Sequence, residues 1–162
     1  MKKSALQCAR AAYQPKLPKG LRGNVTIKEG APTQSVGDQE EIKKLFPNTY
    51  GMPIVEFVPT DEKKEYAPIN IGVILSGGQA PGGHNVICGL YDELKKQNPQ
   101  NKLYGFLMGP GGLVNHKYIE MTDELINEYR NTGGFDMIGS GRTKLEEVDQ
   151  FESGLKIINE LG

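Results

Sequence analysis

The sequence predicts an α/β protein built around a parallel βαβ unit, and three observations support this class. Residues 69–75 form a short apolar run rich in β-branched side chains, which is typical of a buried strand. A glycine-rich loop follows and leads into a segment whose apolar residues recur at helical spacing. Residues 102–107 form a second apolar run. A strand, a helix and a strand in this order make a parallel pair.

Composition limits the size, the binding partners and the location that we expect for this protein. The 162 residues suffice for one domain, and their formal net charge of −1 argues against a nucleic-acid binder with a basic patch. No segment approaches the ~18 consecutive apolar residues of a membrane span. The basic beginning lacks the apolar stretch of a signal peptide. The two cysteines, Cys8 and Cys88, have no metal-ligand spacing. We therefore expect a cytoplasmic protein that binds neither nucleic acid nor membrane.

The first 66 residues differ from the rest and are predicted to form an arm, mostly helical or extended. Asp38 is expected to cap a helix, with Glu41 completing a capping box. Prolines break the chain between the predicted elements. Those elements are helices at 4–13 and 38–46, a strand at 54–58 and a linker at 60–65.

Residues 67–162 are predicted to be the first part of a truncated α/β domain. The strand at 69–75 is expected to be buried on both faces. The helix after it should bury one stripe, formed by Val86, Ile87, Leu90, Tyr91 and Leu94.

Four more elements follow the second strand. We expect a loop at 109–112, a helix capped by Thr122, and a brief strand at 135–138. Thr143 and Glu146 then form a capping box for a last helix. The expected apolar face of that helix comprises Leu145, Val148, Phe151, Leu155 and Ile158. No strand follows, although the alternation calls for one.

The segment from Gly77 to Asn85 has the features of a phosphate cradle. Four glycines and a proline within Gly77–Gly83 let backbone N–H groups approach an anion, and the helix N-terminus adds partial positive charge. The segment is neither a Walker A loop nor a dinucleotide fingerprint. A tight turn that only closes the βαβ unit is the alternative, and the number of glycines favours the phosphate site.

Arg142 is the second candidate, because it follows Ser140–Gly141 at the same predicted sheet edge. An arginine there can clamp a phosphate in bidentate fashion, with Lys144 as a weaker partner. The alternative is a solvated arginine at a helix start. His84 is interpreted as a polar loop residue and His116 as a surface residue. The carboxylates on the predicted helices are interpreted as solvated faces or caps. Asp136 is either near the site or structural, and no nucleophile–base constellation is evident.

Three motifs carry a resemblance to a known family. Residues 71–85 closely resemble the opening of the phosphofructokinases. Residues 131–136 with 139–144 resemble the long, diphosphate-dependent branch, as do residues 13–18. The resemblance implies the N-terminal part of a three-layer, Rossmann-like phosphofructokinase fold.

The resemblance also implies an activity, the transfer of a phosphoryl group from diphosphate to fructose 6-phosphate with magnesium. It places Gly77 and Arg142 at the donor phosphates, with the loop up to Asn85 shaping the site. The expected diphosphate-binding residues are Gly77, Gly78, Gly82, Gly83, Asn85, Arg142 and Lys144.

The family's acidic magnesium loop and its catalytic aspartate have no counterpart in these 162 residues. The chain alone is therefore expected to be inactive, with the magnesium ligands outside it. Two alternatives stay open, a phosphate-binding segment without turnover and an ATP-dependent 6-phosphofructokinase. Family members associate as dimers or larger assemblies, so the same is expected here.

Overall fold

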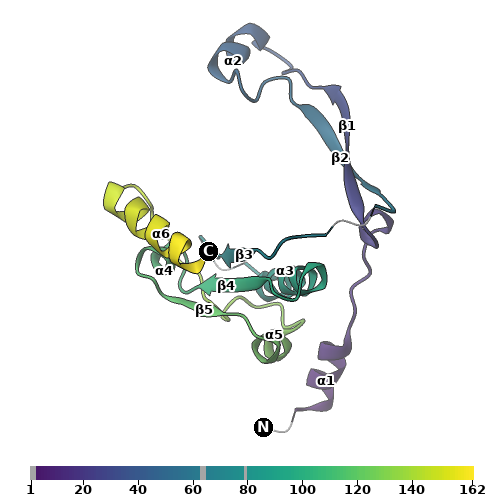
Figure 1. Cartoon of the computed structure of the whole chain (residues 1–162), viewed down its shortest axis with the longest axis vertical. Helices are drawn as coiled ribbons and strands as arrows, with labels where there is room; N and C mark the ends of the chain where they lie inside the picture. Colours follow the sequence, from purple (N-terminus) through teal and green to yellow (C-terminus); the bar gives the residue numbers. More distant parts are fainter. Residues whose placement is uncertain (1–2, 63–64, 79) are drawn as a thin grey trace. The chain divides into compact units, whose positions relative to one another are not determined.

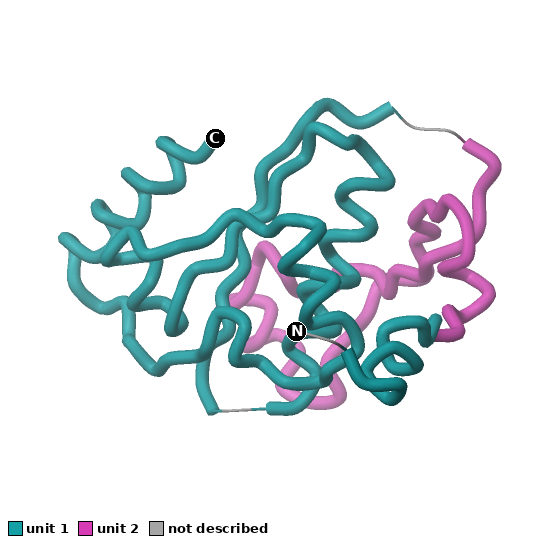
Figure 2. Tube along the Cα trace, turned by 90° about the horizontal axis from the view of Figure 1, so that it is seen from below, with its two compact units in different colours: residues 1–14, 65–162 teal, residues 15–64 magenta. Residues whose placement is uncertain are grey.

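The computed structural model describes residues 3–62, 65–78 and 80–162, and it divides into two compact units (Figure 2). One unit comprises Met1–Gln14 together with Glu65–Gly162, and the other comprises Pro15–Lys64. The predicted linker at 60–65 includes residues 63 and 64, which lie outside the described residues. That residues 1–66 act as an arm stays a prediction. Within the described residues, no helix has the length and apolar character needed to cross a membrane.

The unit of residues 15–64 is an antiparallel hairpin with a helix between its strands (Figure 1). A short 3₁₀ helix, η1 (Lys19–Leu21), precedes β1 (Val25–Pro32). Helix α2 (Gln39–Leu45) and β2 (Pro53–Pro59) follow. The predicted helix and the predicted strand are confirmed, whereas the partner strand β1 was not predicted. Its polar and glycine-containing sequence lacks the apolar run expected of a buried strand.

The predicted capping box at the start of α2 is wrong. Asp38 occupies the N-cap position, but its backbone is left-handed, with φ of 49°, and its side chain makes no capping hydrogen bond. A cap residue normally has extended backbone so that its side chain reaches the N–H groups of the first turn. Only the Asp38 carbonyl contributes, and it accepts a hydrogen bond from the N–H of Ile42 at 2.9 Å.

The predicted βαβ unit is confirmed. Strands β3 (Asn70–Val73) and β4 (Lys102–Phe106) pair in parallel, and helix α3 (Gly83–Gln97) joins them (Figure 1). The expectation that the first strand is buried on both faces is wrong, because β3 lies at the edge of the sheet with its side chains exposed or half-buried. The third strand of the sheet is β5 (Tyr118–Glu120), which pairs antiparallel with β4.

Three further predictions need correction. Residues 109–112 belong largely to a short helix, α4 (Pro110–Val114), because Pro110 at its first position suits a helix start. Residues 135–138 form turns and no strand, since the N–H of Gly139 bonds to the carbonyl of Phe135 at 3.1 Å. The helix expected from Thr143 begins only at Val148, where Glu147 and Gln150 form the capping box.

The final helix, α6 (Val148–Leu161), buries a different face from the one predicted. Its buried residues are Gly154 and Ile157, and it packs against α4. The predicted apolar face is largely exposed at Val148, Phe151, Leu155 and Ile158. Helical periodicity identifies an apolar stripe but does not say which element covers it.

Helix α5 (Asp123–Tyr129) confirms the predicted cap, since the Thr122 hydroxyl accepts from the N–H of Leu125 at 3.3 Å. Helix α5 packs against α3, and α3 and α4 each contact β4. The buried side chains of this unit form one core: Ile87, Cys88, Tyr91, Leu94, Leu103, Met121, Ile126, Met137 and Ile138. Each large aliphatic side chain buried there contributes about 1.5–3 kcal/mol. This core fixes β3, α3 and the loop between them.

Helix α1 (Ala5–Ala12) confirms the first predicted helix, and Ser4 caps it through a capping box with Gln7. Its C-terminal end is held by Asn131, whose side-chain amide donates to the carbonyls of Arg10 and Tyr13, at 2.9 Å each. Asn131 has a left-handed backbone with φ of 58°, a conformation that asparagine tolerates. The start of the chain is thereby tied to the segment of residues 131–137.

Candidate functional site

The predicted glycine loop lies between β3 and α3 and borders a cavity of about 430 Å³. Beta strands in a parallel pair present their carboxyl ends at one edge, where open α/β sheets bind ligands. The loop occupies this edge of β3. Among the residues that line the cavity are Ser76, Gly78, Gly82, Gly83, Phe135 and Ser140. Phe135 and Ser140 lie more than 50 positions further along the sequence than the other four, so the cavity is a product of the fold.

The two predicted halves of the site meet. Ser76 and Gly141 form a parallel β-bridge, and the N–H of Gly77 donates to the carbonyl of Gly141 at 3.0 Å. A Cβ placed on Gly78 would lie 3.2 Å from Nη2 of Arg142. The guanidinium of Arg142 is therefore beside the glycine loop. Within the described part of the chain it forms no ion pair, which leaves its charge for an anion.

Gly77 and Gly83 are two of the loop glycines that the geometry requires. Gly77 has φ of 96°, a conformation that other residues adopt only with strain. At Gly83 the limit is space, since a Cβ would lie 2.7 Å from Cβ of Phe135 and 3.0 Å from Cδ1 of Leu75. The close approach brings the start of α3 against residues 134 and 135.

The N-terminus of α3 points its partial positive charge toward the loop, and no side chain caps it. Two of its N–H groups already have partners, since Gly82 donates to the carbonyl of Gly133 at 2.6 Å and His84 to that of Gly134 at 2.8 Å. In the described residues, no backbone carbonyl accepts from the N–H groups of Gly83 and Asn85. Among the described residues of this first turn, these two N–H groups have no such acceptor and can donate to an anion.

Asn85 and Lys144 are less closely tied to the site. Asn85 lies in the first turn of α3 with its side chain exposed, and it does not line the cavity. The Lys144 side chain is 79% exposed, and its ammonium group pairs with Glu146 at 3.4 Å. Their side-chain roles in anion binding therefore stay predictions, whereas the structure brings Gly77, Gly78 and Arg142 together.

Both histidines were misinterpreted from the sequence. His84 is only 1% exposed, and its ring contacts Thr132, Asp136 and Met137. Burial lowers the pKa of His84, while the nearby Asp136 carboxylate acts in the opposite direction. His116 is half-buried, and its Nε2 lies 3.0 Å from both oxygens of Ser153. A lone histidine in a polar stretch gives no sequence signal of such partners.

The described residues contain no group of three or more His, Cys, Asp and Glu side chains that could hold a metal ion. A metal site built from protein side chains alone would need such a group. Magnesium is commonly held by one or two carboxylates together with substrate phosphates.

Known proteins resemble the chain over nearly its whole length. It is 63% identical over 161 residues, 99% of the chain, to a pyrophosphate–fructose 6-phosphate 1-phosphotransferase of Porphyromonas gingivalis. It is 50% identical over 163 residues to a protein of the same name from Entamoeba histolytica, again with 99% of the chain covered. By sequence, the chain matches the N-terminal region of these phosphotransferases. No family model matches the chain.

The resemblance to the diphosphate-dependent phosphofructokinases is thus confirmed, and the mixed α/β structure is consistent with part of their fold. A phosphotransferase of Treponema pallidum is 44% identical over 170 residues. The chain spans 29% of the length of the Porphyromonas relative and 30% of the other two. The names of these relatives therefore describe proteins of which this chain corresponds to less than a third.

Proposed function

We propose that this chain supplies part of the diphosphate site of an enzyme that transfers a phosphoryl group from diphosphate to fructose 6-phosphate. The supporting observation is the juxtaposition of Gly77 and Gly78 with Arg142 at the edge of a parallel pair of strands. Two sequence segments far apart in the chain form this arrangement. The choice of diphosphate and fructose 6-phosphate as substrates is based on the names of the relatives.

The chemistry of the site suits a phosphoryl donor. Phosphoryl transfer depends mainly on positioning and on neutralising charge on the phosphate oxygens. Here the guanidinium of Arg142 supplies a fixed charge and two donors in one plane. The N–H groups of Gly83 and Asn85 supply further donors at the positive end of α3. These residues bind and orient the donor, and none of them acts as a base.

Magnesium, a catalytic base and the sugar-phosphate contacts belong to the same proposal but come from other residues of the enzyme. We place magnesium on the donor phosphates, where it supplies additional charge neutralisation, with its protein ligands outside the chain. We also propose that the enzyme assembles from two or more subunits and that it is located in the cytoplasm. Both points rest on the family resemblance.

The test is a comparison of phosphoryl donors with the complete enzyme that carries this sequence. A coupled assay measures formation of fructose 1,6-bisphosphate with diphosphate and, separately, with ATP, both in the presence of magnesium. Turnover with diphosphate and little with ATP supports the proposal. The reverse preference would identify an ATP-dependent enzyme, and saturable diphosphate binding without turnover would identify a binding protein.

A further inference from the structure

A buried histidine joins the glycine loop to a segment distant in sequence. His84 is the second residue of α3, and its ring is 1% exposed. Nδ1 lies 2.5 Å from Oγ1 of Thr132, and Nε2 lies 3.0 Å from the N–H nitrogen of Met137. The ring of Tyr129 packs edge-on against it, with centroids 4.7 Å apart. One side chain thus holds residues 129–137 against the start of α3.

The hydrogen bonds fix the tautomer of this ring. The N–H of Met137 can only donate, so Nε2 must be the acceptor and carries no proton. The proton then sits on Nδ1 and is donated to Oγ1 of Thr132. The Thr132 hydroxyl in turn donates a hydrogen bond to the carbonyl of Tyr129 at 2.6 Å. These three hydrogen bonds form a relay from Met137 through His84 and Thr132 to Tyr129. Every donor and acceptor in the relay is satisfied only when the ring is neutral.

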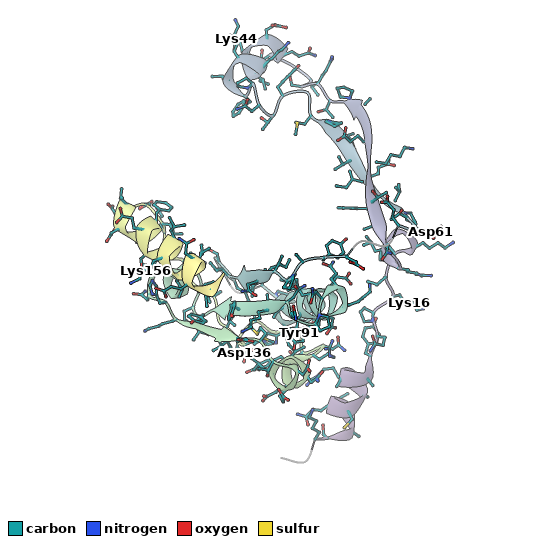
Figure 3. The ribbon with its side chains drawn as sticks, viewed as in Figure 1. Lys16, Lys44, Asp61, Tyr91, Asp136 and Lys156 are labelled. Carbon is teal, nitrogen blue, oxygen red and sulfur yellow. The ribbon has the colours of Figure 1, made fainter. Side chains whose placement is uncertain are left out.

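Protonation of Nε2 would break the relay. The new N–H would face the N–H of Met137, and its closest acceptor would be Oδ1 of Asp136, at 3.1 Å. Asp136 is labelled in Figure 3, and its side chain is 82% exposed. In the described residues it is the charged group that faces the ring. Desolvation of the buried ring outweighs its attraction, so the neutral form prevails at pH 7.

The contacts of the ring sit next to the donors of the site. The backbones of Gly82 and His84 bond to the carbonyls of Gly133 and Gly134, in the same segment that the ring holds. We infer that His84 is a positioning residue for the donor site. In its neutral Nδ1–H form it locks residues 132–137 against α3 and so fixes the N–H groups of Gly83 and Asn85. The expected change in kinetics rests on the proposed function, whereas the protonation state of the ring does not.

The ring state is measured without any substrate. The chain has two histidines, so ¹⁵N-histidine labelling gives two sets of ring signals in a long-range ¹H–¹⁵N NMR spectrum. We expect one ring at pH 7 to be neutral with its proton on Nδ1, and a His84→Gln variant assigns it. A proton on Nε2, or a charged ring, overturns the inference. Asp136→Asn should lower the pKa of His84 further, because it removes the attraction of the carboxylate.

The consequence for the site is measured with Thr132 variants of the complete enzyme. Thr132→Val keeps the shape but removes the acceptor for Nδ1–H, whereas Thr132→Ser keeps it. A misplacement of about 1 Å can cost up to about 100-fold, so we expect Thr132→Val to raise KM for diphosphate about tenfold or more. KM for fructose 6-phosphate should stay unchanged, and Thr132→Ser should restore the original value. His116→Asn is the control, because its ring contacts Ser153 away from this site.

The outcomes are separable. In one outcome, Thr132→Val leaves KM for diphosphate unchanged and lowers only the amount of folded, active enzyme. That outcome indicates a purely structural role and overturns the inference. If the unmodified enzyme does not use diphosphate, the proposed function fails instead. The inference is then decided by the ring tautomer and by whether Thr132→Val shifts the amide NMR signals of Gly82 and Gly83. Unshifted signals overturn it.

Discussion

The hydroxyl group of Ser140 donates a hydrogen bond to the carbonyl oxygen of Gly77 at 3.3 Å. Together with the bridge between Ser76 and Gly141, this bond attaches the segment that precedes Arg142 to the glycine loop. The position of the backbone at Arg142 is therefore set by contacts at the edge of the sheet, and the Arg142 side chain is exposed. Because the backbone is held at Ser140 and Gly141, Arg142 extends from a fixed point and is a suitable anchor for a phosphate.

Replacing Arg142 tests this anchor. Because a hydrogen bond to a charged group contributes about 1.5–3 kcal/mol, Arg142→Ala should lower kcat/KM for diphosphate roughly 10- to 150-fold in the complete enzyme. Arg142→Lys keeps the charge without the bidentate geometry and should recover only part of the loss. Steady-state kinetics at varied diphosphate measure the effect. Lys156→Ala is the matched control, since Lys156 is 70% exposed on α6. Unchanged kinetics with Arg142→Ala would remove this residue from the site.

Gly83→Ala tests the packing of the glycine loop. The added methyl group would lie 2.7 Å from Cβ of Phe135, so we expect a loss of about 1–3 kcal/mol in the free energy of unfolding. Gly89→Ala is the control in the same helix, because a Cβ there meets nothing within 4 Å. It should stabilise the protein by about 0.5–1 kcal/mol. Urea unfolding of both variants measures the difference. Equal effects would contradict the close approach.

The two cysteines should differ in reactivity. Cys8 is exposed, whereas Cys88 is buried and its thiol lies 3.7 Å from the carbonyl of Ile126. Burial raises the pKa of Cys88, so both access and thiolate formation are suppressed. Iodoacetamide at pH 7.5 should modify Cys8 first, and Cys88 only after unfolding. Peptide mass spectrometry reads the result, and equal labelling of both under native conditions would contradict it.

The sequence was most informative where local pattern and structure coincide. The glycine loop and the cap at Thr122 each depend on neighbouring residues, and both were predicted correctly. The predicted stripe of α3 is confirmed at Ile87, Tyr91 and Leu94, which are buried, and is wrong at Val86, which is 63% exposed. Arg142 was placed at the sheet edge by family resemblance and by βαβ geometry together. The structure then showed the contact with Gly78.

The missed features depend on contacts between distant residues. Strand β1 has a polar sequence and forms because β2 pairs with it. The role of His84 depends on Thr132 and Met137, some 50 positions away, and no local spacing encodes it. The exposed face of α6 was misjudged for the same reason, since periodicity marks an apolar stripe without naming its partner.

Tyr91 provides a test of alkaline stability. Tyr91 lies on the buried face of α3 and is labelled in Figure 3, and its hydroxyl donates to Oδ1 of Asp123 at 2.9 Å. Burial first, and then the bond to Asp123, raise the pKa of Tyr91 from 10.0 to about 12. The folded state thus holds this proton more tightly than the unfolded state does. Its stabilising effect is complete below pH 10 and is lost as the pH rises toward 12.

The Tyr91→Phe variant makes this effect measurable. Near pH 7 the variant should be about 1 kcal/mol less stable, because it lacks the hydrogen bond to Asp123. The rise in pKa corresponds to roughly 2–3 kcal/mol, so between pH 10 and 12 the original protein should lose that much more than the variant. The two stability curves should therefore cross. Urea unfolding from pH 7 to 11.5 measures them, with Tyr13→Phe as the control, since Tyr13 is 60% exposed. Parallel curves for Tyr91→Phe and the original protein would show that the folded state does not hold this proton more tightly.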